Sequence, residues 1–180
     1  MPYRINAAME DSLVSIFTGI LGGTVIWTMQ DAYDDLAAVK PILPFTTLNI
    51  ISGPTPVDDY EMIPSESGEI EFDYERRHEF TLSVNIHEND GHLAAAARLA
   101  FMLRIDKYRD MLTLAGISLL ETNNIGDISV LDETRFKLRA HIDFVFSYIS
   151  KIKDVPVGVI EHVYIEGTLG NIAVSVEAHK

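Results

Sequence analysis

TRFKLRAHIDFVFSY, residues 134–148, is the stretch that decides the fold of this 180-residue chain. Its even-numbered positions from 136 onward are all apolar or aromatic, whereas its odd-numbered positions begin with basic and polar residues. A period of two places these two sets on opposite faces of an extended chain. At about 3.3 Å per residue the segment would span about 46 Å, far beyond the usual strand of about 5–6 residues. We therefore expect one over-long strand whose far end is satisfied by something outside its own core.

The composition limits the class of protein. A hydrophobic content of 47% is enough to bury a core and excludes wholesale disorder. No apolar run approaches the roughly 18 residues of a transmembrane helix, and the N-terminus lacks the pattern of a signal peptide, so we expect no membrane contact. Cys is absent, which removes disulfides and thiolate metal sites and fits folding in the cytosol. The formal net charge of -13 argues against a nucleic-acid-binding surface.

The segment 69–87 is a second long alternating run, with apolar residues on one face and mostly acidic residues on the other. Arg76 and His78 interrupt the apolar face midway, which suggests that the sheet leaves the core or meets a partner there. The segment that carries these acidic residues is similar in length to the first segment, which carries the basic ones. A phosphate-binding stripe would explain the basic residues alone, but cross-strand ion pairs, within one subunit or between two, explain both. The two sets are Glu71, Asp73, Glu75 and Glu79, and Arg135, Lys137 and Arg139.

Helical periodicity indicates helices over residues 6–22, 91–105 and 106–115. The helix over 91–105 is so apolar that we expect it to be covered on more than one side. Shorter strands are expected at 24–29, 45–51, 117–121, 157–166 and 172–176. Because strands and helices do not alternate regularly, the order predicts an α+β fold: a mostly antiparallel sheet with long strands and two to three helices packed on one face.

The domain organisation follows from the spacing of these segments. We expect a single domain over residues 1–180 with a mobile loop at about 52–69, since that stretch is rich in prolines, glycines and acidic residues and is long for a connection inside a compact domain. Residues from about 168 to 180 are expected to form a short C-terminal extension.

The chain carries no recognisable catalytic motif. It has no phosphate-binding loop, dinucleotide-binding fingerprint or serine nucleophile elbow. His87, Glu88, Asp90 and His92 could be drawn as a metal cluster, but they span a strand end, a turn and a helix start, so their side chains need not converge. A solvated acidic turn in which Asp90 caps the following helix is the simpler interpretation. We therefore expect no catalytic residue, no cofactor, no metal and no enzymatic activity.

The order of the segments is nevertheless distinctive. The sequence resembles the tail or neck terminator proteins of tailed bacteriophages over nearly the whole chain. The similarity is carried by the order and spacing of loose motifs, above all the 127–148 strand with Arg139 and Asp143 and the closing 158–167 strand. These motifs are VIWTMQ at 25–30, LPFTTLNIISG at 43–53, RRHEFTLSVNIHENDG at 76–91, GDISVLDETRFKLRAHIDFVFSY at 126–148 and GVIEHVYIEGTL at 158–169.

The resemblance implies a structural virion protein, located in the tail and neck region and assembled in the cytoplasm of the host bacterium. Such terminators form a hexameric ring on the last ring of the tail tube, stop its polymerisation and present a surface to the head-side connector. In contractile tails they also hold the sheath, and DNA passes through the ring without specific binding. Two alternatives stay open: a head-tail joining or other tail-completion ring of the same assembly, and a small metal-dependent enzyme built on the histidine cluster.

The charged residues of the two long segments are our candidate interface to neighbouring subunits or partner proteins. Opposite charges on separate strands could set the register between adjacent copies of a ring. The residues of this hypothesis are Arg135, Lys137, Arg139, Glu71, Asp73, Glu75, Arg76 and Arg77.

Overall fold

A computed structural model describes residues 5–28, 41–59, 61–64, 72–88, 90–132, 135–153, 162–169 and 172–179. The chain divides into two compact units. The first comprises Met1–Glu61 and Glu75–Lys151, and the second comprises Met62–Tyr74 and Ile152–Lys180. The sequence predicts a single domain over residues 1–180, and that statement remains a prediction.

Helix α1 (Ala7–Leu21) forms as its sequence predicts, because both of its ends are capped. The Asn6 side chain accepts a hydrogen bond from the backbone N–H of Ala8 at 2.9 Å. At the other end Gly22 adopts a left-handed conformation with φ 77°, and its N–H donates to the Thr18 carbonyl at 2.8 Å. One stripe of the helix is buried, formed by Glu10, Leu13, Ile16, Phe17 and Ile20.

The central sheet has the strand order β1-β2-β4-β9-β5, with β3 added to β4 and β6 added to β9. Strand β1 pairs with β2 in parallel, whereas β2 with β4, β5 with β9 and β6 with β9 are antiparallel. The mostly antiparallel sheet confirms the predicted α+β class. The strands are β1 (Thr24–Trp27), β2 (Phe45–Pro56), β3 (Glu61–Pro64), β4 (Phe72–His87), β5 (Ile117–Thr122), β6 (Gly126–Asp127) and β9 (Arg139–Lys153).

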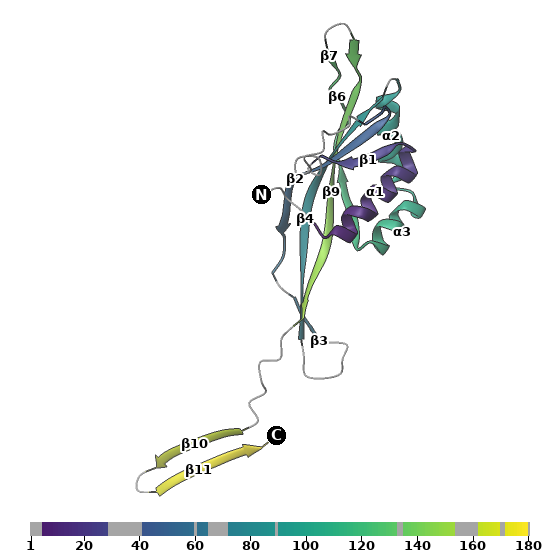
Figure 1. Ribbon diagram of the computed structural model, residues 1–180. Helices are drawn as coiled ribbons and strands as arrows, with labels where there is room; N and C mark the ends of the chain where they lie inside the picture. The colour runs from purple at the N-terminus through teal and green to yellow at the C-terminus, as the bar shows by residue number, and fades with distance from the viewer. Residues whose placement is uncertain are drawn as a thin grey trace. The chain divides into compact units, whose positions relative to one another are not determined.

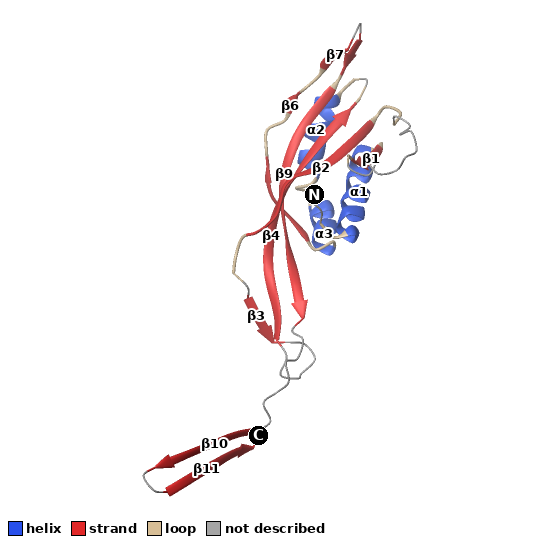
Figure 2. Ribbon diagram, turned by 60° about the vertical axis from the view of Figure 1, so that its left-hand side comes forward, coloured by secondary structure: helices blue, strands red, loops and turns tan. Residues whose placement is uncertain are grey.

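The three helices of the described part lie on the same face of this sheet (Figures 1 and 2), as the sequence predicts. Helices α2 (His92–Met102) and α3 (Asp106–Leu114) both contact α1. The aromatic half of the opening stretch packs beneath them: the rings of Phe144 on β9 and Phe17 on α1 lie 6.1 Å apart, and those of Phe146 and Phe80 lie 5.6 Å apart. Both β9 rings are completely buried, so this end of the strand forms the centre of the core.

The basic half of the opening stretch does not continue the long strand. The ladder breaks at Leu138, and the preceding residues form β8 (Arg135–Lys137), which pairs with β7 (Val130–Asp132) as a separate two-stranded sheet. Ser129 accounts for the break, because its hydroxyl oxygen accepts the Arg139 N–H at 3.1 Å and anchors the base of the hairpin. Strand β9 instead runs on at its other end to Lys153.

Strand β2 continues to Pro56, although the sequence predicts a loop from about residue 52 onward. The prolines fit because the pairing with β4 shifts register between Ile50 and Ser52 and again between Ser52 and Thr55. Gly53 has φ 85° and packs so closely on Glu79 and Phe80 that a Cβ atom would collide with their backbone. Residues 61–64 form β3, and residues 60 and 65–69 of the expected loop lie outside the described residues.

Asp90 does not cap α2 as the sequence suggests. The N-cap is Gly91, with φ 79°, and no side chain bonds to the first turn. Glycine adopts this left-handed conformation at little cost. Gly91 can therefore turn the chain into the helix although no Asp or Ser side chain caps it. The helix therefore begins one residue later than the expected cap requires.

The second unit contains a β-hairpin formed by β10 (His162–Leu169) and β11 (Ile172–His179). The two strands are antiparallel and pair from His162 opposite His179 to Leu169 opposite Ile172. Two strands are predicted here from sequence, but the first runs three residues further than expected and the second is also longer. Residues 157–161 of the predicted strand lie outside the described residues.

Candidate assembly surfaces

One acidic residue of β4, Glu75, has a cross-strand partner, and this partner is not one of the three basic residues that the sequence suggests. Glu75 forms an ion pair with Lys151 near the far end of β9. The Glu75 side chain is only 20% exposed, whereas that of Lys151 is 63% exposed. This pair therefore contributes to the pairing of β4 with β9 within one chain. Glu71 and the side chain of Asp73 lie outside the described part.

Arg76 and Arg77 both reach back to the end of β2. The Arg77 Nε lies 3.1 Å from a carboxylate oxygen of Asp58, and the Arg76 Nε donates to the Asp58 backbone carbonyl at 2.9 Å. His78, which interrupts the apolar face, stacks on Tyr148 and lies 2.9 Å from the Ser150 hydroxyl. The polar interruption thus has partners inside the chain.

The basic residues beside the break in the long stretch lie at the β7–β8 hairpin. Lys137 is exposed, and the side chain of Arg135 lies outside the described part. Arg139 is half-buried, and its Nε is buried without a hydrogen-bond partner in the described part of the chain. The facing strand exposes two large apolar residues, Val130 at 60% and Leu131 at 59%. An exposed hairpin of this kind, apolar on one strand and basic on the other, is suited to contact with another chain.

The histidines of the proposed metal cluster point to different places. The ring of His87 stacks on Phe45 with centroids 4.3 Å apart, whereas His92 reaches across to the β6 segment. Glu88 and Asp90 join neither histidine in a ligand set, because no group of three or more metal-binding side chains occurs among the described residues. Nothing in this arrangement supports the enzyme alternative.

His92 contacts Asp127 and Ser129, three residue types that also occur in catalytic triads. The His92 Nε2 lies 3.4 Å from both the Asp127 carboxylate and the Ser129 hydroxyl, while Ser129 donates to Asp127 at 2.6 Å. In a triad the carboxylate and the hydroxyl engage opposite ring nitrogens, so this geometry cannot activate the serine. The hydrogen bond from the Ser129 hydroxyl, supported by its N–H and by His92, lowers the pKa of Asp127 below its ordinary value of 3.8. The cluster fixes the β6 segment against the start of α2.

A polar cluster on the sheet face away from the helices was not anticipated from the sequence. The Nδ1 of His141 on β9 lies 3.1 Å from the Asn85 side-chain oxygen and 3.4 Å from the Ser83 hydroxyl on β4. Its Nε2 lies 3.2 Å from the Asp143 carboxylate. The alternation of residues 83–86 does show that two polar residues share this face, but their meeting with His141 depends on strand register. The cluster links the two longest strands and makes this face of the sheet polar.

Among the residues that the structure describes, helix α2 is covered on one side only, whereas its apolar sequence predicts cover on more than one. Ala96 and Leu99 are completely buried, whereas Leu93 and Phe101 are 41% and 68% exposed. The residues between them on the outward face are alanines, and the neighbouring Arg98 is exposed. Burial of such a face is favourable in water, so the apolar sequence predicts a cover that the described part of the chain does not supply.

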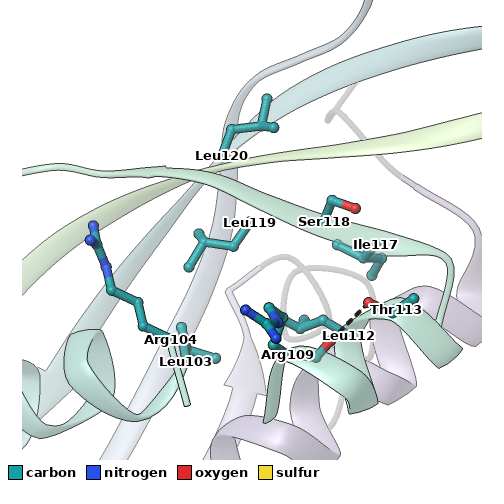
Figure 3. Close-up of a pocket in the computed structure, with 9 residues that line it drawn as sticks. All are labelled: Leu103, Arg104, Arg109, Leu112, Thr113, Ile117, Ser118, Leu119 and Leu120. Carbon is teal, nitrogen blue, oxygen red and sulfur yellow. Dashed lines mark hydrogen bonds between the residues drawn. The ribbon is translucent and has the colours of Figure 1, made fainter. Parts of the chain in front are cut away.

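An open groove of about 370 Å³ runs between α3 and the edge strand β5. Figure 3 shows Leu119 and Leu120 on opposite sides of β5, with Leu119 on the side of the helices. The groove has an apolar floor and two arginines along it. Its lining residues are Leu103, Arg104, Arg109, Leu112, Thr113, Ile117, Ser118, Leu119 and Leu120.

The fold and these surfaces define a class of protein: an α+β structural subunit with exposed apolar and charged faces suited to contact with other chains. The sequence matches the family described as phage neck terminator protein over residues 7–172. The chain belongs to this family, which confirms the resemblance drawn from its motifs. A search of curated proteins returns no match.

Membership of this family makes the chain a structural protein of the phage tail and neck, where it interacts with other phage proteins. The family is one of structural proteins and not of enzymes. No helix in the described part of the chain is both long and apolar enough to cross a membrane.

Proposed function

We propose that the protein forms a ring, hexameric in the assembled virion, that caps the tail tube, ends its polymerisation and presents the interface to the head-side connector. The observation that carries this proposal is the outward face of α2, where Leu93 and Phe101 are exposed beside an otherwise complete core. Exposed apolar faces of this kind mark contacts with other chains. Tube protein, connector and, in a contractile tail, sheath are the partners of the proposed ring.

The charged residues give the proposed ring its register. Arg135, Lys137 and Arg139 of one copy would meet acidic residues of the next, foremost Glu71 and Asp73. Two different surfaces of the same chain then form a heterologous contact. Such a contact closes into a ring when the rotation from one copy to the next is a whole-number fraction of a full turn. A net charge of -13 supports a lumen that repels DNA and lets it pass without specific binding.

The test is to add the purified protein to tail-tube protein that is polymerising in vitro and to measure tube lengths by electron microscopy. We expect shorter tubes with a ring density at one end. Tubes of unchanged length without such density would overturn the proposal. Binding to the purified connector without any effect on tube length would instead assign the protein to the alternative, a head-tail joining ring.

A further inference from the structure

Strand β5 is an edge of the central sheet. It pairs with β9 on one side, from Ile117 opposite Tyr148 to Thr122 opposite Phe144, and no described strand pairs with its other side. Ser118 and Glu121 are exposed, and Leu120 is 48% exposed. An open edge offers a row of backbone N–H and C=O groups that an added strand can pair with.

The groove beside this edge defines what an added strand must carry. Its floor is formed by Leu103, Leu112 and Leu119, and the guanidinium groups of Arg104 and Arg109 lie along it (Figure 3). Arg109 is already paired with Asp106 at 2.8 Å, and Arg104 is exposed. The chemistry fits a strand that turns successive apolar residues toward the floor and brings no basic group near the two arginines.

The β10–β11 hairpin of this chain has that pattern. Its register and the alternation of faces place both residues of each of four cross-strand pairs on a common face, and every one of these residues is apolar or glycine. The pairs are Val163 with Ala178, Ile165 with Val176, Gly167 with Val174, and Leu169 with Ile172. The opposite face has both glutamates of the hairpin, Glu166 and Glu177, and residues 162–179 contain no Lys or Arg.

The hairpin forms a sheet of its own in the described part of the chain. A two-stranded hairpin is at best marginally stable in water, because it can cover neither of its faces. Its apolar face would be stabilised by a partner surface, and the β5 edge with its apolar groove offers a place for a strand of this composition.

We propose that the β10–β11 hairpin of one copy adds to the β5 edge of the next copy, with its apolar face over the groove. The inference rests on the proposed ring and deepens it, since it assigns the donor and acceptor surfaces of the subunit contact. Donor and acceptor are different parts of the chain, so the contact is heterologous and repeats around a ring. Glu166 and Glu177 lie on the face of the hairpin that is turned away from the groove, so neither carboxylate is buried in this contact.

A photo-crosslinking amino acid at Ser118 tests the contact directly, because this exposed residue lies on the β5 edge. Isotopically heavy and light chains are mixed, assembled on purified tail tubes and irradiated, and the crosslinked peptides are mapped by mass spectrometry. We expect heavy-to-light crosslinks from position 118 to residues 162–179. Crosslinks confined to one chain, or rings whose crosslinks lead elsewhere, overturn this inference and leave the ring proposal standing. Absence of any ring overturns both.

A pair of variants gives the second readout. Ile165→Glu with Val176→Glu places charge on the apolar face, whereas the control Thr168→Glu with Ser175→Glu places the same charge on the opposite face. We expect the first to raise the concentration needed for ring assembly at least about tenfold and the control to change it less than about twofold. Equal effects of the two pairs would contradict the proposed orientation of the hairpin.

Discussion

Leu93 and Phe101 lie two helical turns apart on the outward face of α2, and both are exposed, at 41% and 68%. Between these turns, on the inward face, Ala96 and Leu99 are completely buried. The helix is thus apolar on both sides, although the described residues cover only one of them. This arrangement is the main physical reason to expect that the protein works in contact with other chains.

Replacing both exposed residues, Leu93→Glu and Phe101→Glu, is expected to abolish ring assembly while the monomer stays folded. Burial of each apolar side chain in an interface contributes about 1.5–3 kcal/mol, so each change should weaken assembly about tenfold or more. Assembly is measured by light scattering in the presence of tail tubes, and folding by thermal unfolding.

The matched control for this pair is Leu114→Glu, an equally apolar residue on α3 that is 88% exposed. It should leave both assembly and folding unchanged, since it lies outside the proposed surface. Loss of assembly in the control but not in the α2 variant would mean that the contact surface is on α3.

Reversing two charges of the β7–β8 hairpin, Arg135→Glu with Lys137→Glu, is expected to weaken ring assembly at least about tenfold, because like charges would then meet across the contact. Unfolding in urea should change by no more than about 1 kcal/mol. The control is Lys151→Glu, which breaks the pair with Glu75 inside the chain and should affect assembly little. If the β7–β8 variant lost folding stability and assembly equally, Arg135 and Lys137 would be paired within the subunit.

Phe144→Ala is expected to destabilise the folded chain by about 3–5 kcal/mol, since it removes a completely buried ring that packs on Phe17. Phe101→Ala provides the comparison, with an expected change within about 0.5 kcal/mol for an exposed ring. Urea unfolding followed by circular dichroism measures both. Similar losses for the two would place the core elsewhere than on the aromatic half of β9.

The Asp127–Ser129 contact predicts a pH dependence of stability. Because the folded-state pKa of Asp127 lies below 3.8, the ionised carboxylate stabilises the fold above that pH, and the stabilisation is lost as the pH falls through the folded-state pKa. Ser129→Ala removes the strongest cause of the shift, so the variant should be less stable than the parent at neutral pH, and the difference should shrink as the pH falls from neutral through the folded-state pKa of Asp127. A difference that stays constant in urea unfolding across this range would contradict the role of the hydrogen bond.

The local sequence pattern predicts those helices and strands in which the spacing of apolar residues alone decides which side chains are buried. The alternation of residues 140–148 and the stripe of α1 identify the residues that become buried, including Phe144 and Phe17. The α+β class follows from the same periods. The family could be predicted as well, because its motifs depend on order and spacing.

Features that depend on strand register could not be predicted from the sequence. The break at Leu138 arises because Ser129, ten residues away, accepts the Arg139 N–H. The pairing of Glu75 with Lys151 likewise follows from which residues of β4 and β9 face each other. The partner is therefore Lys151 and not one of the basic residues at 135, 137 and 139 that the sequence pattern suggests. The one-sided burial of α2 could not be predicted either, because an apolar helix looks the same whether its cover comes from its own chain or from another.

The most direct test of the central claim is deletion of the gene from its phage, followed by electron microscopy of the particles. The account predicts tails that are longer than normal or unable to join heads, and rescue by the parent protein but not by the Leu93→Glu, Phe101→Glu variant. Tails of normal length, joined to full heads in the absence of the protein, would contradict it.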